Sequence, residues 1–326
     1  MKYFSVLFYL LPFSVFGQPK LTWQNVDSAF APLPKSVHIY FTKQAIDTAS
    51  FKAYYVVADL QEKSIDFTTD TTLKRRLTPS QFFSKNNAPV VVINGAFFSF
   101  ETNTNRNVVI KEGKILSYNQ HTIDGKGKDT LTYWHPFPST IGITKNREAD
   151  IAWTVTDSAS RDVYASQYVL KPVKDSVNQH SLNYLLQAGN TGSQQSASAS
   201  FKKWTMQTAI GGGPVLVQQN NIAITNNEEI KFGGRAINDK HPRIAIGYTK
   251  DQKLIILAIE GRSKESGGAT LPQTAQILKD LGCVEALNLD GGGSSCLLIN
   301  GKETIRPSDA RGQRPVPSVF MITRKD

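Results

Sequence analysis

The sequence predicts an α/β (α+β) fold, with a mixed β-sheet core and a few flanking helices that include a C-terminal strand–helix–strand unit. Three observations support this prediction. The chain has 326 residues, 40% of them hydrophobic, so it can bury a core without metals or disulfides. Short β-branched runs recur in both halves, which is typical of buried strands. In the last third, two such runs flank a segment with helical spacing.

The N-terminal part of this core is predicted to hold three strands and one helix. The expected strands cover residues 37–41, 54–60 and 89–93. A helix should begin after Thr78, because Pro79 suits a first helical turn and Gln81 stands at the capping-box position. Asn94-Gly95 then indicates a hairpin turn, since both residue types tolerate a positive φ.

The C-terminal third has the most regular pattern. Expected strands cover residues 244–247, 254–259, 286–289 and 319–322. Thr270 and Gln273 form a capping box at the start of a helix, and Gly282 should end it. Residues 254–289 therefore form a strand–helix–strand unit, which usually places two parallel strands side by side.

The first seventeen residues are typical of a secretory signal peptide. Lys2 supplies a positive charge, residues 3–16 are mostly apolar, and Val15 and Gly17 are small residues at the cleavage-site positions. An uncleaved membrane anchor is the alternative, although the apolar run is short for a membrane span. We therefore expect an exported protein, periplasmic or secreted, with no stable membrane span once the signal is removed.

The remaining residues, 18–326, are expected to form a single domain. Residues 101–200 are more polar and irregular, and we interpret them as a loop-rich insertion built of hairpins and loops. Residues 192–200 are rich in serine and are expected to form a mobile surface loop.

Charge and cysteine content exclude several classes of protein. The net charge is +10, but no Lys/Arg cluster of the nucleic-acid-binding type occurs. The five histidines show no zinc-protease spacing. No metal-binding residue and no cofactor is predicted, and whether a divalent ion binds stays open. Cys283 and Cys296 are too few for a disulfide framework. We expect two small buried residues there, with a disulfide between them as the alternative.

The strongest sign of chemistry is the segment Asn288-Leu289-Asp290-Gly291-Gly292-Gly293-Ser294-Ser295. A predicted buried strand ends in a carboxylate, and three glycines follow it. Ligands of α/β units bind just beyond such strand ends, and glycines leave backbone N–H groups open to an anion. Asp290 could therefore be catalytic or orient a ligand. It could equally accept hydrogen bonds from its own tight turn.

Other segments indicate a function only when they are considered together. Gly211-Gly212-Gly213-Pro214 could form a second close-approach surface, or merely a bend before a strand. Arg243 and Arg262 flank a predicted strand pair and could hold a phosphate, or form ordinary surface ion pairs.

These segments together resemble the phosphodiester glycosidase family. The resemblance covers roughly residues 37–326 and is strongest from residue 204 onward. It rests on an ordered series of motifs: Asn94-Gly95-Ala96-Phe97-Phe98, Gly211-Gly212-Gly213-Pro214, His241-Pro242-Arg243-Ile244-Ala245-Ile246-Gly247, Glu260-Gly261-Arg262, Gly268-Ala269-Thr270-Leu271-Pro272, the Asp290 segment, and Arg314-Pro315-Val316-Pro317-Ser318.

The resemblance implies a hydrolase that cleaves a sugar-1-phosphodiester, such as an N-acetylglucosamine-1-phosphodiester, to a free sugar and a phosphate monoester. Asp290 and Glu260 are then the expected catalytic carboxylates, with Glu260 standing where the family usually has Asp. Their separate roles stay open, as does retention or inversion. The expected substrate-binding residues are Asn94, Gly95, Gly212, Gly213, Arg243, Arg262, Asn288, Gly291, Gly292, Gly293 and Ser294.

Two other functions compete with this one. A non-catalytic envelope glycan-binding protein could share the fold, but it would not need the carboxylates. A nucleic-acid-binding protein fits least, because aromatic and basic residues are not interleaved. The expected partner is a small-molecule or glycan phosphodiester, not a nucleic acid; the oligomeric state stays open.

Overall fold

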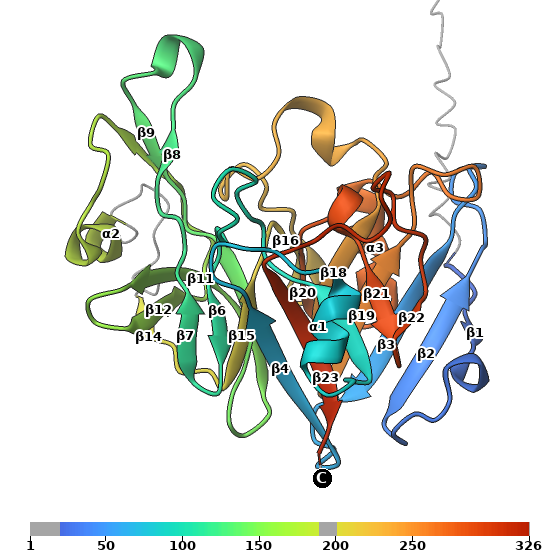
Figure 1. The fold of residues 1–326 in the computed structure, drawn as a ribbon. Helices are drawn as coiled ribbons and strands as arrows, with labels where there is room; N and C mark the ends of the chain where they lie inside the picture. The colour runs from blue at the N-terminus through green and yellow to red at the C-terminus, as the bar shows by residue number, and fades with distance from the viewer. Residues whose placement is uncertain (1–19, 189–200, 326) are drawn as a thin grey trace, which may run out of the picture.

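The computed structural model describes residues 20–188 and 201–325. The predicted signal peptide, residues 1–17, and the predicted mobile loop, residues 192–200, lie outside these ranges. Within them the chain is mostly β, with three short α-helices against four sheets (Figure 1). None of the helices described is long and apolar enough to cross a membrane.

Four sheets organise the described strands. The eight-stranded sheet runs in the order β1 (Gln24–Asn25), β2 (Val37–Thr42), β3 (Ala53–Asp59), β19 (Lys253–Ile259), β18 (Arg243–Thr249), β20 (Cys283–Asn288), β16 (Val215–Gln218), β17 (Asn221–Ile222). The seven-stranded sheet runs β14 (Lys202–Lys203), β12 (Asp162–Ser166), β11 (Ala149–Asp157), β10 (Ser139–Ile143), β15 (Thr208–Gly211), β6 (Val109–Lys111), β7 (Lys114–Ser117). The five-stranded sheet runs β22 (Lys302–Glu303), β21 (Leu297–Ile299), β5 (Val91–Asn94), β23 (Ser318–Arg324), β4 (Ile65–Thr71), and the three-stranded sheet runs β13 (Val173–Asp175), β9 (Tyr133–His135), β8 (Ile123–Asp124).

Helices are few and short. The α-helices are α1 (Pro79–Lys85), α2 (Leu182–Ala188) and α3 (Leu271–Asp280); the 3₁₀ turns are η1 (Asp27–Phe30), η2 (Gly127–Asp129), η3 (Gly234–Ile237) and η4 (Gly292–Ser294). The capping boxes at Thr78 and Thr270 are confirmed, each with its glutamine bonded back to the cap. Gly282 follows α3 with φ +87°, as the sequence predicts for a helix end.

The prediction of a mixed sheet is wrong. Every pairing between the described strands is antiparallel, and β19 and β20 do not lie side by side. The reason is β18: a tight turn at residues 250–252 pairs it with β19, so the crossover through α3 must place β20 on its other edge. β19 and β20 are therefore parallel to each other but separated by one strand.

The hairpin predicted at Asn94-Gly95 is also absent. Asn94 ends β5, which pairs with β21 and β23, two strands distant in sequence. The Asn94 side chain is fully buried and bonded to the loop after β20, so it serves a long-range contact instead of a local turn.

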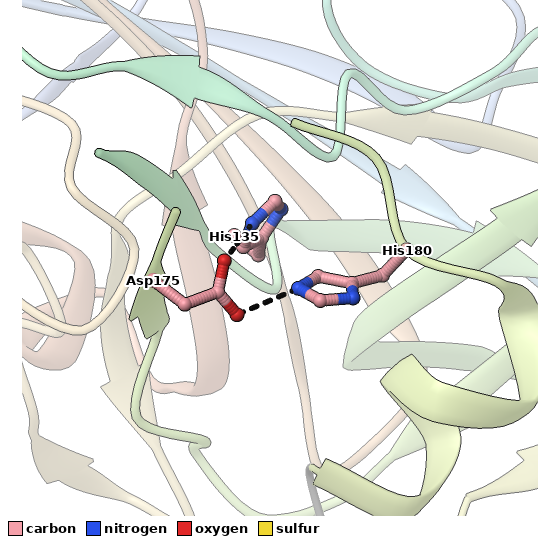
Figure 2. A group of neighbouring side chains, drawn as sticks. All are labelled: His135, Asp175 and His180. Carbon is pink, nitrogen blue, oxygen red and sulfur yellow. Dashed lines mark hydrogen bonds and ion pairs between the residues drawn. The ribbon is translucent and has the colours of Figure 1, made fainter. Parts of the chain in front are cut away.

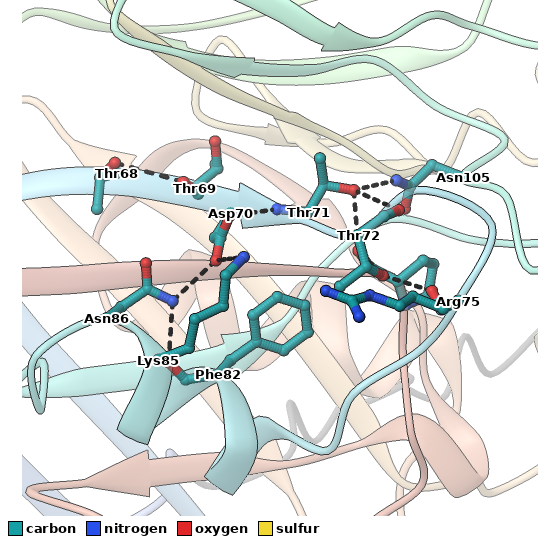
Figure 3. A network of polar contacts seen from close by, with 11 residues as sticks. Thr68, Thr69, Asp70, Thr71, Thr72, Arg75, Phe82, Lys85, Asn86 and Asn105 are labelled. Carbon is teal, nitrogen blue, oxygen red and sulfur yellow. Dashed lines mark hydrogen bonds and ion pairs between the residues drawn. The ribbon is translucent and has the colours of Figure 1, made fainter.

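A polar network fixes α1 to β4 (Figure 3). The buried carboxylate of Asp70 accepts bonds from Lys85 Nζ at 2.7 Å and Asn86 Nδ2 at 2.9 Å. On the same strand, Thr71 Oγ1 accepts from Asn105 Nδ2 at 2.8 Å. Asn105 Oδ1 in turn accepts from Ser318 Oγ, whose oxygen accepts the N–H of Ala96. The network thus supports the segment that follows β5.

One large apolar cluster joins the three larger sheets. It includes Ile93 and Phe320 of the five-stranded sheet, Ile141 of the seven-stranded sheet and Ile244 of the eight-stranded sheet. Residues 101–200 contribute β6 to β13 and α2, so much of the predicted insertion is sheet. Cys283 and Cys296 are free and buried, as expected, and burial raises the pKa of Cys283 to about 12.

Candidate active site

The ends of three neighbouring strands meet at one edge of the eight-stranded sheet. Because β18 is antiparallel to both neighbours, it begins where β19 and β20 end. Arg243 begins β18, Glu260 follows β19, and Asp290 follows β20 by two residues. This arrangement brings the two predicted carboxylates and one predicted arginine to the same sheet edge.

The glycine loop after Asp290 is held by side-chain and backbone bonds from other segments. Asn94 Nδ2 donates to the Asp290 carbonyl at 2.6 Å, and Asn94 Oδ1 accepts the Cys296 N–H at 3.0 Å. The Gly292 N–H donates to the Pro242 carbonyl at 2.9 Å. The Asp290 N–H points at the Gly95 carbonyl at 3.3 Å. Asn94 and Gly95 thus support the loop directly.

Two guanidinium groups lie against this loop, and glycine makes their approach possible. A Cβ on Gly293 would lie 2.0 Å from Arg314 Nη2, and one on Gly292 would lie 3.3 Å from Arg262 Nη2. Gly292 also has φ +59°, a conformation that glycine adopts without strain. The loop therefore presents backbone and two cations on one surface.

Asp290 as a whole is only partly exposed, and its carboxyl group has an unusually high proton affinity. Burial raises its pKa to about 6, against the opposing effects of the Ser294 side chain, the Arg314 charge and the Gly291 N–H. Such a group changes protonation close to neutral pH. It is therefore suited to proton transfer or to nucleophilic attack once it is ionised.

The second glycine run packs against the end of β20. The Gly213 N–H donates to the Asn288 carbonyl at 2.7 Å, and a Cβ on Gly212 would lie 2.5 Å from that same oxygen. Gly213 has φ +111°, and a Cβ there would lie 2.1 Å from Glu229 Oε2. Only glycine fits this position, and the second glycine run therefore packs closely against the end of β20.

Asn288 is fully buried between these runs. Its Nδ2 donates to the carbonyls of Gly213 at 3.2 Å and Leu289 at 2.7 Å. Its Oδ1 is buried without a hydrogen-bond partner among the described residues. A buried acceptor of this kind is usually satisfied by an ordered water.

The two predicted arginines have different surroundings. Arg262 is exposed with φ +60°, and its Nη2 lies 3.2 Å from His241 Nδ1. Arg243 is buried, and its Nε donates to the Ala269 carbonyl and its Nη2 to the Asp239 carbonyl, both at 3.0 Å. Burial, with the nearby Arg262 charge, lowers the pKa of Arg243 to about 10. Arg262 is thus the one with donors free for a ligand, while Arg243 adds charge beneath it.

Glu260 is already occupied by donors. Its side chain is 1% exposed and accepts from Lys52 Nζ at 2.9 Å, Ser263 Oγ at 3.1 Å and the Arg306 N–H at 2.9 Å. Burial opposes ionisation, but these three donors outweigh it and hold the pKa below its usual value. The catalytic role stays a prediction. The contacts give Glu260 a clear positioning role, because it ties β19 to the segment at Arg306.

A cavity of about 580 Å³ opens beside Glu260 and Arg262. Residues 260–265 form one wall and residues 306–312 most of the other. Ser308, in the second wall, donates to the Gly292 carbonyl at 3.2 Å. The cavity therefore adjoins the glycine loop and offers space for a ligand.

Sequence reasoning did not assign three charged residues near this edge. The sequence could have identified Arg314, because this residue begins the last motif of the family series. No sequence feature identifies Lys231 and Glu229, since they stand in a charged run that is typical of a surface. Glu229 is instead buried and accepts from Ser139, Thr225 and the Val215 N–H, among others. Burial lowers the pKa of Lys231 to about 8, although the Glu229 charge opposes this.

The surroundings of Asp290 are cationic and do not resemble a metal site. Among the described residues, a cluster of histidine and aspartate with the spacing of metal ligands lies in the three-stranded sheet and the segment before α2. The glycine loop with its guanidinium groups is instead suited to an anion.

Comparisons with known proteins show which proteins this chain resembles. Short matches link the chain to N-acetylglucosamine-1-phosphodiester alpha-N-acetylglucosaminidase of mouse, 30% identical over 102 residues, and of human, 36% identical over 101 residues. These cover 29% and 31% of this chain but only 20% and 19% of those enzymes. The SPbeta prophage-derived uncharacterized protein YomE of Bacillus subtilis is 42% identical over 90 residues, 28% of this chain and 14% of that protein. The chain thus matches a fifth or less of these relatives' length.

Solved structures share the fold over most of the chain. The catalytic domain of the zebrafish N-acetylglucosamine-1-phosphodiester alpha-N-acetylglucosaminidase superposes with a TM-score of 0.57 at 18% identity, covering 94% of this chain and 89% of that one. A hypothetical protein from Synechocystis gives 0.57 at 17% identity, covering 94% and 68%. The family model for phosphodiester glycosidases matches residues 146–323, more than half of the chain. This protein therefore belongs to the phosphodiester glycosidase family.

Proposed function

We propose that the protein is an exported hydrolase that cleaves a sugar-1-phosphodiester to a free sugar and a phosphate monoester. The observation that carries this proposal is Asp290, whose carboxyl titrates near neutral pH beside a glycine loop that Arg262 and Arg314 contact. Family membership supports hydrolase chemistry, and the names of the mouse and human relatives support an N-acetylglucosamine-1-phosphodiester as the first substrate to test.

The carboxylate and the two cations have separate roles in the reaction. The bond between the anomeric carbon and the phosphate oxygen breaks, and the phosphate leaves with the bonding electrons. Arg262 and Arg314 stabilise the negative charge that develops on it. Because a phosphate is a good leaving group, little help from a general acid is needed. Ionised Asp290 either removes a proton from the water that attacks the anomeric carbon, or attacks that carbon itself to form a sugar ester. In the second case water then hydrolyses the ester, which releases the free sugar and restores Asp290.

A direct test is release of free sugar from a panel of sugar-1-phosphodiesters that differ in sugar and in alcohol. We expect at least one member to be hydrolysed by the wild-type protein and not by Asp290→Ala. No release from any member, or equal release by both proteins, would contradict the proposal. Tight binding of the panel without turnover would favour the non-catalytic glycan-binding function instead.

The pH dependence follows from the pKa of Asp290. If the ionised carboxylate is the reactive form, kcat/KM should rise as pH increases through about 6 and level off above it, because protonated Asp290 is inactive. Initial rates across this range, at substrate concentrations well below KM, measure the profile of the free enzyme. A profile that falls as pH rises through about 6 would assign Asp290 as a general acid.

Export is proposed from the sequence pattern at residues 1–17. Intact-mass measurement of protein recovered from the periplasm or medium should show a chain that begins near Gln18. An exported chain that still begins at Met1 would contradict cleavage, and retention in the cytoplasm would contradict export.

A further inference from the structure

Three of the five histidines of the chain gather around a second cavity, far in sequence from Asp290. This cavity has a volume of about 580 Å³, and His121, His135 and His180 line it. Asp124 and Asp157 add two carboxylates to its wall. None of its lining residues lines the cavity beside Glu260. It is therefore a separate feature of the molecule.

His135, Asp175 and His180 point toward one another at this cavity (Figure 2). His135 Nε2 lies 3.4 Å from Asp175 Oδ1, and His180 Nε2 lies 2.7 Å from Asp175 Oδ2. One ligand atom from each residue lies within 4.8 Å of the others. In a tetrahedral site with bonds of about 2.0–2.2 Å, donor atoms lie about 3.3–3.6 Å apart. Small side-chain movements would therefore bring all three atoms to metal-bonding distance.

Neighbouring groups orient both imidazole rings. His135 Nδ1 lies 3.2 Å from the His121 carbonyl, so an N–H there would leave Nε2 facing Asp175. The ring of His180 stacks on Tyr184 with centroids 3.8 Å apart and planes at 14°. A metal-bound histidine usually donates its second N–H to a carbonyl or carboxylate in just this manner.

The cluster presents more acceptors than donors. The Val177 carbonyl lies 3.0 Å from the same Nε2 of His135 that faces Asp175. Two oxygens that converge on one ring nitrogen need either a proton on that nitrogen or a cation beside it. A metal ion would satisfy all of these groups together.

His121 gives a second, independent sign of an absent partner. Its Nε2 contacts the backbone of Thr156, but its Nδ1 is buried with no hydrogen-bond partner among the described residues. An orphaned nitrogen on the same cavity wall is expected where an ion or its bound water completes the site.

We propose that His135, Asp175 and His180 bind one divalent transition-metal ion of the zinc type. Two imidazole nitrogens and one carboxylate oxygen suit zinc, and the cavity leaves a fourth position open to water. The site joins three segments: His135 on β9, Asp175 on β13 and His180 just before α2. The bound ion would therefore cross-link the three-stranded sheet to α2.

The test is zinc titration of the mature protein without a polyhistidine tag. We expect calorimetry and elemental analysis after dialysis to give one zinc ion per chain. Co²⁺ in its place should show the visible absorption bands of a low-coordinate site. Asp175→Asn and His180→Ala should each weaken zinc binding at least tenfold, which is the order of effect seen for groups that hold a metal.

The matched control is His38→Ala. His38 also pairs with an aspartate, at 2.8 Å from Asp27 Oδ2, but it lies outside the cavity. This variant should bind zinc as the wild type does. Asp175 and His180 are both partly exposed, so their variants should fold, which circular dichroism checks. No zinc binding by the wild type would overturn the proposal and favour a proton on His135. Unchanged binding by both variants would also overturn it.

Discussion

Asp290→Asn should lower kcat/KM for the hydrolysed sugar-1-phosphodiester by ~10³-fold or more, which is the loss expected for a principal catalytic group. The substitution keeps the shape of the side chain and removes only its ability to ionise. Little packing depends on this side chain, because Asp290 lies partly exposed after the end of β20. Steady-state rates and thermal unfolding should be measured on the same preparation.

The same variant should be more stable than the wild type at neutral pH. Asp290 has a folded-state pKa near 6, above the ordinary value of 3.8, so the fold prefers the neutral carboxyl. Ionisation therefore destabilises the folded state progressively as pH rises from about 4 through about 6, and the penalty is complete above that. A shift of this size corresponds to about 1–3 kcal/mol, and the gain on substitution should vanish below about pH 4.

The opposite pair of results would remove Asp290 from the mechanism. If Asp290→Asn unfolds earlier but keeps near-normal turnover below its transition, the residue only shapes the turn. Glu260 would then be the leading catalytic carboxylate, in spite of its three donors.

Arg262→Met should lower kcat/KM by ~10²-fold, the usual effect of removing one group that stabilises transition-state charge. Arg262 contacts the loop at Gly292 and forms its side-chain hydrogen bond with His241, so most of its donors are free for the phosphate. Methionine keeps much of the length of the side chain. Because Arg262 is exposed, its loss should hardly change the free energy of unfolding.

Lys264→Met is the matched control for this variant. It removes an exposed positive charge two residues away on the same wall of the cavity. We expect it to change kcat/KM less than twofold, by long-range electrostatics alone. If both variants lose activity equally, the effect of Arg262 is only that of net charge. If neither does, the phosphate binds elsewhere, with Arg314 as the next candidate.

Local sequence predicts the elements of this fold better than their partners. The capping boxes at Thr78 and Thr270 depend on residues three apart, so the sequence alone identifies both. The order of strands depends on which edges of neighbouring strands pair, and β18 pairs with β19 on one edge and with β20 on the other. That is why the placement of β18 between β19 and β20 was not predicted.

The candidate site also has a part that the local sequence predicts and a part that it does not. Asp290 and its glycines stand in one contiguous string, whereas Glu229 is buried against residues from distant segments, such as Ser139. The metal cluster is a more extreme case. His135 and Asp175 are forty positions apart, and the pairing of β9 with β13 brings them together. No spacing rule in the sequence could have found them.

The side chain of Asn94 has a consequence for how the protein would bind the proposed substrate. One amide group bonds to both ends of the loop, at the Asp290 carbonyl and the Cys296 N–H. A glycine-rich segment left free would lose about 1–2 kcal/mol of conformational entropy per residue on becoming ordered. Because Asn94 orders the loop when the chain folds, this entropy is lost during folding and not when the ligand binds. The loop is therefore preorganised, so a ligand that binds beside it would not have to order it.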